Sequence, residues 1–459
     1  MSAGPRIASP SRVVRLAALC VSACALACRV GPDYERPAIE APPAYLTNAD
    51  EDDSLADLAW WDLFQDPVLI ELIDTALVEN RDLRTAVARI DEAAATLGIV
   101  SSDLYPRLDY GGSAIFDATT AGDGDTSNSR AAFLSAGWQV DLWGRFRRAS
   151  EAAFQELLAT EDAARAVRLS LVAAVAESYI VLRDLDNRQS ISEQTAETRR
   201  ENLDIIQARF DGGSVTEVDL NQAQIQLYEA EASVQVFARR RRQTENALSV
   251  LLGSPPLQIP RGLELGEQLL LPELPAAGLP SELLDRRPDV LAAERRLHAQ
   301  TERIGVAEAL RFPQFDLTSS IGASGNGVSA GFFQLGANLF GPIYNAGELK
   351  SNIAAEVARA EQSLFAYEQA ILDAWREVED ALVAVETLEL ELATRSRQVA
   401  AAQNAADLAW SRYDEGFTSY LELLETQRAL FSAELAESET RQLLLNAVVD
   451  LYAALGGGW

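Results

Sequence analysis

The spacing of hydrophobic residues along this chain changes in a fixed order, and that order occurs twice. Apolar residues first recur at helical spacing through residues 67–104 and again through 282–311. Asp66 precedes the first segment as a typical helix N-cap, and the proline after it suits a first helical position. Pro106 and Pro313 end the two segments, because a proline disfavours helix in the residue before it. We therefore predict a helix of moderate length at the start of each copy.

After each of these two prolines the period falls from 3.6 to 2, which is the pattern of a strand with one apolar face. This alternation covers four segments, and a polar, glycine-rich loop separates the two segments of each copy. Each segment has the length of a tilted membrane-spanning strand, which is about 10 residues. The predicted strands are 106–118, 130–142, 313–324 and 331–341.

A very long helix is predicted after each pair of strands. Residues 145–211 and 348–415 contain neither glycine nor proline, and we predict helices over 145–211 and 345–415. At ~1.5 Å per residue each would be about 100 Å long, which favours a coiled-coil-like assembly over an ordinary globular domain. Glycines then reverse the chain, and a shorter helix returns in each copy, at 214–252 and 417–455.

The turns between the long and the returning helices are also repeated. The sequence "RYDEGFTSYLELLETQ" at 412–427 aligns with "RFDGGSVTEVDLNQAQ" at 209–224, at an offset of 203 positions. Residues 82–113 align in the same way with 289–320, at an offset of 207. The chain is therefore predicted to contain two copies of one unit. The predicted parts are a signal peptide at 1–27, an extended segment at 28–66, the first repeat at 67–253, a proline-rich linker at 254–280 and the second repeat at 281–456.

The charge of the chain excludes one class of partner. With 69 acidic and 39 basic residues the net charge is −30, whereas nucleic-acid binding requires clustered cations. Two interpretations of this acidity stay open, a solubilising surface and a negatively lined channel.

The cysteines and the single histidine argue against catalysis. The three cysteines of the chain all precede residue 29, so the body of the protein can form no disulfide and no thiolate metal site. His298, the one histidine, provides neither a histidine-based zinc site nor a serine–histidine pair. We predict that the protein is not an enzyme and has no cofactor and no metal.

The amino terminus is typical of a secreted lipoprotein. Arginines precede an apolar run at 16–27 that ends in small residues and is too short to span a bilayer. The sequences "VSAC" and "ALAC" both fit a lipoprotein cleavage site, and the local pattern slightly favours Cys24 over Cys28. Since no later window is apolar enough for a membrane helix, a chain that crosses a membrane must do so as a closed β-barrel.

The number of predicted strands has a consequence for assembly. Four strands cannot close a barrel alone, and two chains would give eight strands around an interior filled by side chains. Three chains would give twelve strands and a lumen, so a conduit requires a trimer. The alternative is a soluble pair of hairpins on a helical stalk. The apolar side of the strands, which no helix is predicted to cover, favours lipid.

Six motifs carry a resemblance that covers essentially the whole mature chain. They are "CRVGPDYERP" at 28–37, "AWWDLFQDPVL" at 59–69, "DLWGRFRRA" at 141–149, "LLDRRPDVLAAERRL" at 283–297, "GPIYNAGELKSN" at 341–352 and "LYAALGGGW" at the carboxyl end. With these motifs the chain resembles the TolC-like outer-membrane efflux channels. More narrowly, it resembles their lipoprotein (OprM/NodT) branch, which partners RND-type pumps.

The resemblance implies an α+β membrane protein with a long α-helical barrel and a transmembrane β-barrel, built as a homotrimer with four strands per chain and twelve in all. It implies a location in the outer membrane of a Gram-negative bacterium, with the protein extending into the periplasm and lipid attached at Cys28. The implied function is that of a passive exit duct for small molecules that an inner-membrane pump delivers through a periplasmic adaptor. A type I protein-secretion exit channel and a soluble periplasmic helical adaptor are the alternatives.

The resemblance also places a gate at the repeated turns. It implies that Leu421, Glu422 and Glu425 line the narrowest point, with Asp219 at the corresponding place in the first copy. The family commonly has Asp at position 425, and some members carry a basic residue where this chain has Thr418, so the contact that latches the gate stays open. The residues implied to form the tip turns and the gate links are Arg209, Gly213, Arg412, Tyr413 and Gly416.

Overall fold

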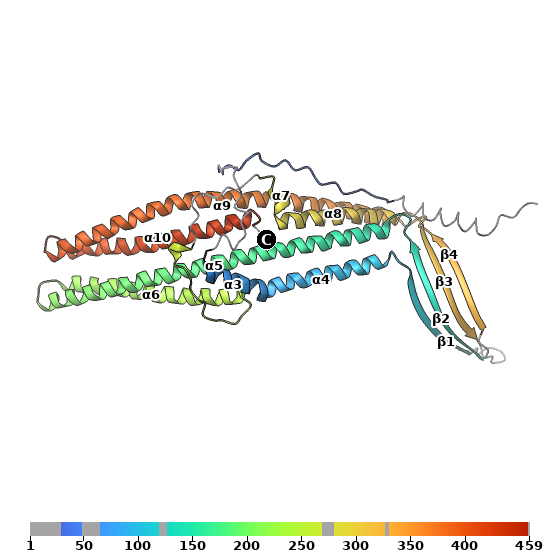
Figure 1. Ribbon diagram of the computed structural model, residues 1–459, viewed down its shortest axis with the longest axis horizontal. Helices are drawn as coiled ribbons and strands as arrows, with labels where there is room; N and C mark the ends of the chain where they lie inside the picture. The colour runs from blue at the N-terminus through green and yellow to red at the C-terminus, as the bar shows by residue number, and fades with distance from the viewer. Residues whose placement is uncertain (1–28, 48–64, 119–125, 269–279, 326–329, 458–459) are drawn as a thin grey trace, which may run out of the picture. The chain divides into compact units, whose positions relative to one another are not determined.

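The computed structural model describes residues 29–47, 65–118, 126–268, 280–325 and 330–457. This part of the chain is mostly helical and contains one four-stranded antiparallel sheet, which confirms the predicted fold class (Figure 1). The elements are α3 (Pro67–Glu79), α4 (Arg81–Ser102), β1 (Arg107–Ala118), β2 (Thr126–Val140), α5 (Arg145–Asp211), α6 (Glu217–Leu251), η2 (Leu265–Glu267), α7 (Leu283–Arg286), α8 (Pro288–Ala309), β3 (Gln314–Gly325), β4 (Ala330–Phe340), α9 (Glu348–Asp414) and α10 (Tyr420–Ala454).

The first helix of each copy is interrupted, so the expectation of single helices over 67–104 and 282–311 was wrong. Asn80 separates α3 from α4, and Arg287 separates α7 from α8. Asn80 has extended backbone angles, and its side chain accepts a hydrogen bond from the backbone N–H of Leu83, so it caps α4. Arg287 is also extended, as expected of a residue that precedes a proline.

The chain forms two compact units, each built from three stretches of sequence. Unit 1 takes its described residues from 1–38, 88–161 and 292–369 and contains the sheet. Unit 2 takes its described residues from 39–87, 162–291 and 370–459 and contains both turns between a long helix and a returning helix.

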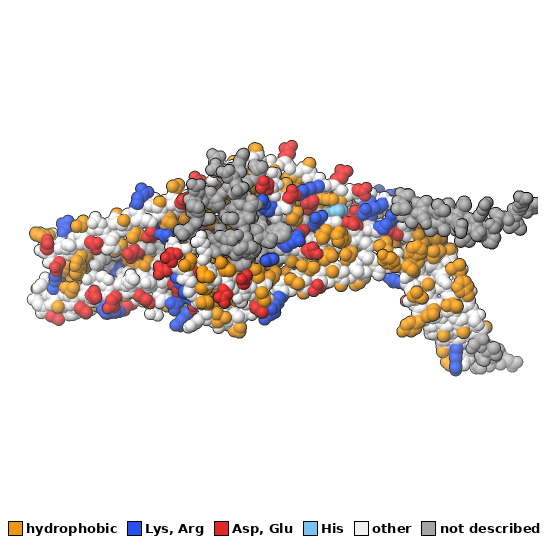
Figure 2. Space-filling model, viewed as in Figure 1, with side chains coloured by type: hydrophobic (Ala, Val, Ile, Leu, Met, Phe, Trp, Pro, Cys, Tyr) orange, Lys and Arg blue, Asp and Glu red, His pale blue; other side chains and the backbone are white. Residues whose placement is uncertain are grey.

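The sheet has the strand order β1-β2-β3-β4, and every neighbouring pair is antiparallel. Its register places one residue from each strand in a continuous row across the sheet. One such row is apolar and exposed, and Figure 2 shows apolar side chains gathered over the strands. That row consists of Tyr110, Leu134, Ile321 and Phe333.

The neighbouring row lies on the opposite face of the sheet, because successive side chains of a strand point to opposite sides. It is polar throughout, and Ser320 Oγ donates to Gln334 Oε1 within it at 3.4 Å. The row consists of Asp109, Ser135, Ser320 and Gln334. The sheet therefore has one apolar and one polar face, with no described helix paired against the apolar face.

A buried carboxylate organises the start of α3 in unit 2. The side chain of Asp66 accepts from Val68 N at 2.9 Å, which confirms its predicted role as the N-cap. It also accepts from the hydroxyl of Tyr179 at 3.0 Å, from Leu263 N at 2.9 Å and from Gln268 Nε2 at 2.8 Å. Asp66 is fully buried, so these four donors replace the water that the carboxylate loses on folding.

None of the helices in the described part of the chain is both long enough and apolar enough to cross a membrane. The same residues contain no cluster of His, Cys, Asp and Glu that could hold a metal ion.

Candidate functional site

Two helical hairpins in unit 2 carry the residues of the predicted gate. The chain reverses between α5 and α6 at Gly213 and between α9 and α10 at Gly416, with φ values of +75° and +80°. In each turn the backbone N–H after the glycine donates to the carbonyl oxygen five residues earlier, at 2.8 Å in both cases. This arrangement is a Schellman motif, which requires a left-handed residue that glycine adopts without strain.

An apolar cluster joins the two hairpins below their turns. Within one hairpin, the rings of Tyr413 on α9 and Tyr420 on α10 lie with their centroids 5.3 Å apart, and residues of α5 and α6 complete the cluster. Burial raises the pKa of Tyr420, and the neighbouring Tyr413 and Asp219 add to the rise, so the hydroxyl stays neutral at physiological pH. The buried members of the cluster are Ile206, Leu220, Ala223, Ala409, Tyr413, Tyr420, Leu423 and Leu424.

In the described part of the chain, ion pairs bridge the two hairpins at two places, Arg188–Glu439 between α5 and α10 and Arg209–Asp414 near the turns. Arg209 Nη2 at the end of α5 lies 2.8 Å from Asp414 Oδ1 at the end of α9. The guanidinium of Arg209 also lies over the ring of Tyr413, 5.1 Å from its centroid, at cation–π distance. The structure therefore brings together two of the predicted link residues, Arg209 and Tyr413, and adds Asp414.

The second predicted arginine makes its contact within one hairpin. Arg412 Nη1 lies 3.6 Å from Glu422 Oε1 across the turn between α9 and α10. The hydroxyl of Thr418 donates to the other carboxylate oxygen of Glu422. Both side chains of the ion pair are about half exposed, so it is a weak surface pair by the usual standard.

The remaining predicted gate residues differ in how they are held. Glu425 pairs with Arg428 one turn further along α10, at 3.0 Å. Leu421 is 55% exposed and does not belong to the apolar cluster. Asp219 forms a reciprocal capping box with Thr216 at the start of α6, so its carboxylate is engaged within its own helix.

Two residues of the hairpins were missed at the sequence level. Asp414 matches Asp211 in the repeat alignment, but nothing in that match predicts an ion pair with Arg209. Tyr420 aligns with Glu217 at the offset of the repeat, so the comparison of the two copies gave no signal for a buried ring.

The chain matches a known family and several known proteins over most of its length. The family described as "Outer membrane efflux protein" matches residues 72–254 and 279–457. The chain belongs to this family. It is 33% identical to "Cation efflux system protein CusC" of Escherichia coli O6:H1, over 97% of this chain and 99% of the relative. It is 36% identical to "Probable efflux pump outer membrane protein TtgC" of Pseudomonas putida, over 94% of this chain and 93% of the relative.

Solved structures agree with the family assignment. The structure titled "Crystal Structure of the Open State of the Neisseria gonorrhoeae MtrE Outer Membrane Channel" matches with a TM-score of 0.86 and 33% identity. The match covers 94% of this chain and 98% of that chain. The predicted resemblance to outer-membrane efflux channels is therefore confirmed.

In this outer membrane efflux protein a buried arginine holds the segment that starts at Arg29. Arg148 on α5 is fully buried, and its Nη1 donates to Pro32 O and to Glu302 Oε2, both at 2.9 Å. Arg29 reaches the same carboxylate at 2.6 Å. Gly305 leaves the space for this arginine, because a Cβ there would lie 2.1 Å from Arg148 Cδ. Cys24 and Cys28, the two candidate lipidation sites, lie outside the described residues.

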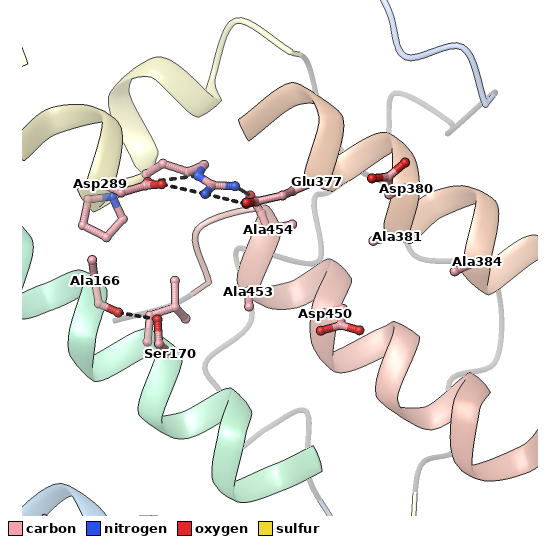
Figure 3. A pocket seen from close by; sticks show the side chains of 13 residues that line it. Ala166, Ser170, Asp289, Glu377, Asp380, Ala381, Ala384, Asp450, Ala453 and Ala454 are labelled. Carbon is pink, nitrogen blue, oxygen red and sulfur yellow. Dashed lines mark hydrogen bonds and ion pairs between the residues drawn. The ribbon is translucent and has the colours of Figure 1, made fainter. Parts of the chain in front are cut away.

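A cavity of about 400 Å³ in unit 2 of this efflux protein is lined by carboxylates and small side chains (Figure 3). Arg287 pairs with both Asp289 and Glu377 at its edge, each at 2.7 Å. Ser170, the one hydroxyl residue of the lining, donates to the carbonyl oxygen of Ala166 in its own helix. The Ser170 hydroxyl therefore has its partner within its own helix.

A protonatable carboxyl lies beside this cavity. Burial raises the pKa of Glu177 on α5 to about 7, and the charge of Asp450 and a hydrogen bond with it add to the rise. Asp450 lines the cavity, where Figure 3 shows it on α10. A proton shared between Glu177 and Asp450 is therefore retained at mildly acidic pH.

Proposed function

We propose that this protein is the outer-membrane channel of a tripartite efflux system, in which it is a passive exit duct for small molecules. Three copies would form the duct, a periplasmic adaptor would dock on it, and an inner-membrane RND-type pump would supply the energy. Membership of the outer membrane efflux protein family supports the location and the transport function. The trimer and the two protein partners are inferred from the architecture and the family.

The two-faced sheet with two open edges is the observation that carries the proposal. β1 and β4 are the outer strands, so one side of each has no partner strand among the described residues. An unpaired strand edge is costly in lipid, because backbone N–H and C=O groups find no water there. Pairing β4 of one copy with β1 of the next satisfies both edges at once, and repeated pairing closes a ring.

The number of copies in the ring follows from the need for a lumen that small molecules can pass. Three copies would contribute twelve strands and enclose a lumen, whereas two would give eight strands and a filled interior. The apolar row through Tyr110, Leu134, Ile321 and Phe333 would then face lipid. The polar row through Asp109, Ser135, Ser320 and Gln334 would face water.

The hairpins are proposed to form the closed end of the duct, with Leu421, Glu422 and Glu425 from each copy at the narrowest point. Three copies of Glu425 would form a ring of like charges. At ~7 Å separation and an effective dielectric constant of 20, each pair repels by about 2 kcal/mol. Closure must therefore depend on other contacts, of which Arg209–Asp414 and Arg412–Glu422 are the candidates. Such a gate would be weakly held and easily opened.

Lipid attachment at Cys28 is proposed for the same assembly. The residue after it, Arg29, is fixed through Glu302 to a buried arginine, so the chain is ordered directly from the proposed attachment point. Attached lipid would add a second membrane anchor to that of the sheet.

The experiment that tests the proposal uses the two faces of β4. The purified full-length protein should require detergent for extraction, have the mass of three chains and produce discrete conductance steps in planar bilayers. Phe333→Asp, which places a charge on the apolar face, should abolish insertion. Its neighbour on the polar face gives the matched control, and Gln334→Asp should insert normally. A monomer that stays in solution without detergent and conducts no current would refute the proposal.

A further inference from the structure

Two of the phenylalanines on the polar face of the sheet lie in one row across the strands, and a third, Phe340, lies at the end of β4. The register pairs Gly111 with Phe133, Phe133 with Gly322 and Gly322 with Phe332, so glycine and phenylalanine alternate across the four strands. This row lies two residues along each strand from the polar row, and it is therefore on the same face. Both phenylalanine side chains are partly exposed.

The glycines of this row make room for the Phe133 side chain. A Cβ added to Gly111 would lie 2.5 Å from Cζ of Phe133, so the ring extends across that glycine. A Cβ added to Gly322 would lie 2.7 Å from Cβ of Phe133 and 2.4 Å from the carbonyl oxygen of Ala132. An aromatic side chain lying over a cross-strand glycine is a recognised stabilising arrangement of sheets.

A negative charge, that of Asp109, lies near this row, and the nearest cation on the same face of β1, Arg107, is two positions beyond Asp109. Asp109 lies two positions before Gly111 on the same strand and the same face, and it is exposed. The protein as a whole carries a net charge of −30. An exposed aromatic ring next to a carboxylate attracts a cation that itself carries an aromatic or other apolar group.

We propose that Phe133 and Phe332 of three copies form a band of six aromatic rings inside the lumen, and that this band transiently binds aromatic cations in transit. The proposal rests on the proposed function, because the polar face borders a lumen only in the closed trimer. Ile115 and Phe340 are the other large apolar side chains described on this face, and both lie outside this row, so the band would be one place where the duct contacts the apolar part of a solute.

Blockade of single-channel current tests this inference. The probes are benzyltrimethylammonium and tetramethylammonium, which share their charge and differ in the aromatic ring. In the wild type, benzyltrimethylammonium should block at about fivefold lower concentration than tetramethylammonium. The double variant Phe133→Leu/Phe332→Leu should lose most of this difference and keep its conductance steps.

Phe333→Leu is the matched control, because Phe333 is adjacent to Phe332 in the sequence and lies on the opposite face. It should leave the difference between the two probes unchanged. If channels form but the double variant discriminates between the probes as well as the wild type does, the inference is wrong and the proposed function stands. If no channels form, both fail.

A labelling experiment gives an independent measurement. The chain has no cysteine after residue 28, so a single cysteine at the sheet can be modified selectively. A charged, water-soluble methanethiosulfonate should lower the conductance of Phe332→Cys and should not change that of Phe333→Cys. The opposite result would place Phe332 outside the lumen and overturn the inference.

Discussion

Asn80 and Arg287 occupy equivalent positions in the two copies, and each donates to a carbonyl oxygen at the end of the helix that returns from the hairpin. Asn80 Nδ2 lies 2.9 Å from Leu251 O, and Arg287 Nη1 lies 2.9 Å from Ala454 O. Leu251 and Ala454 are themselves separated by the offset of the repeat. In each copy, the residue that interrupts the first helix therefore binds the carboxyl end of the last helix. We call this contact the helix joint; an asparagine makes it in the first copy and an arginine in the second.

Asn80→Ala is expected to lower the free energy of unfolding by about 2 kcal/mol. The change removes the donor to Leu251 O and also the acceptor that caps α4 at Leu83 N, and Asn80 is buried. Thermal unfolding of the detergent-solubilised protein, followed by circular dichroism, measures the loss.

Asn80→Asp separates the two contributions of this side chain. The carboxylate keeps the cap on α4 but cannot donate to Leu251 O, so its cost should come from the lost hydrogen bond and from a buried charge next to that carbonyl oxygen. If Asn80→Asp were as stable as the wild type, the hydrogen bond to Leu251 O would contribute nothing and the proposed role of the helix joint would be wrong.

Glu177 is expected to make stability fall as the pH rises. The pKa of this carboxyl is raised from 4.5 to about 7 in the folded protein, so between these values the folded state holds a proton that the unfolded chain releases. The free energy of unfolding should therefore decrease from about pH 4.5 to pH 7 and become level above that range. Melting temperatures measured from pH 4.5 to pH 8 test this slope.

Glu177→Gln should remove most of the slope and should melt higher than the wild type at pH 8, because the amide is neutral and can still donate to Asp450. Asp380→Asn is the control, since Asp380 is the equivalent residue of the second copy and its side chain is 69% exposed. An unchanged slope in Glu177→Gln would assign the pH dependence to another group.

Arg412→Ser is expected to raise the resting conductance of the reconstituted channel. The ion pair with Glu422 is weak, so its loss should increase the open population by about two- to fivefold. Glu422→Gln should have a similar effect, and Arg395→Ser, which removes an ion pair within the length of α9, should have none. Unchanged conductance of Arg412→Ser in a planar bilayer would remove this arginine from the gate.

Arg209 and Asp414 are expected to act as one unit in holding the hairpins together. Either Arg209→Ala or Asp414→Ala should raise resting conductance, and the double variant should add little, because each single change already breaks the pair. The charge-reversed pair Arg209→Asp/Asp414→Arg should restore part of the closed state. Fully additive effects of the two single changes would show that these residues do not act through each other.

Much of the fold could be predicted from local patterns. The change of period at Pro106 and Pro313 marked where helices end and strands begin, and the absence of glycine and proline over 145–211 marked a helix that occupies those residues in the structure. The break at Arg287 also has a signal in the sequence, because the next residue is proline. The break at Asn80 had no proline or glycine, and it depends on the tertiary contact with Leu251.

For the candidate site, the sequence predicts where the backbone turns but not which side chains pair. Gly213 and Gly416 were identifiable because a reversal after a long helix favours a residue with positive φ. The partners of Arg209 and Arg412 were not identifiable, because the choice among nearby carboxylates depends on how the two hairpins approach each other. Asp219 illustrates the same limit, since its carboxylate caps its own helix in addition to any part it has in the gate.

The contact between Phe133 and Gly111 limits how this sheet can evolve. No side chain fits at Gly111 while the Phe133 ring lies across it. A small residue at position 133 would expose the backbone of Gly111 to solvent. Descendants of this protein should therefore keep both residues or replace both together, so the two positions are inherited as a pair.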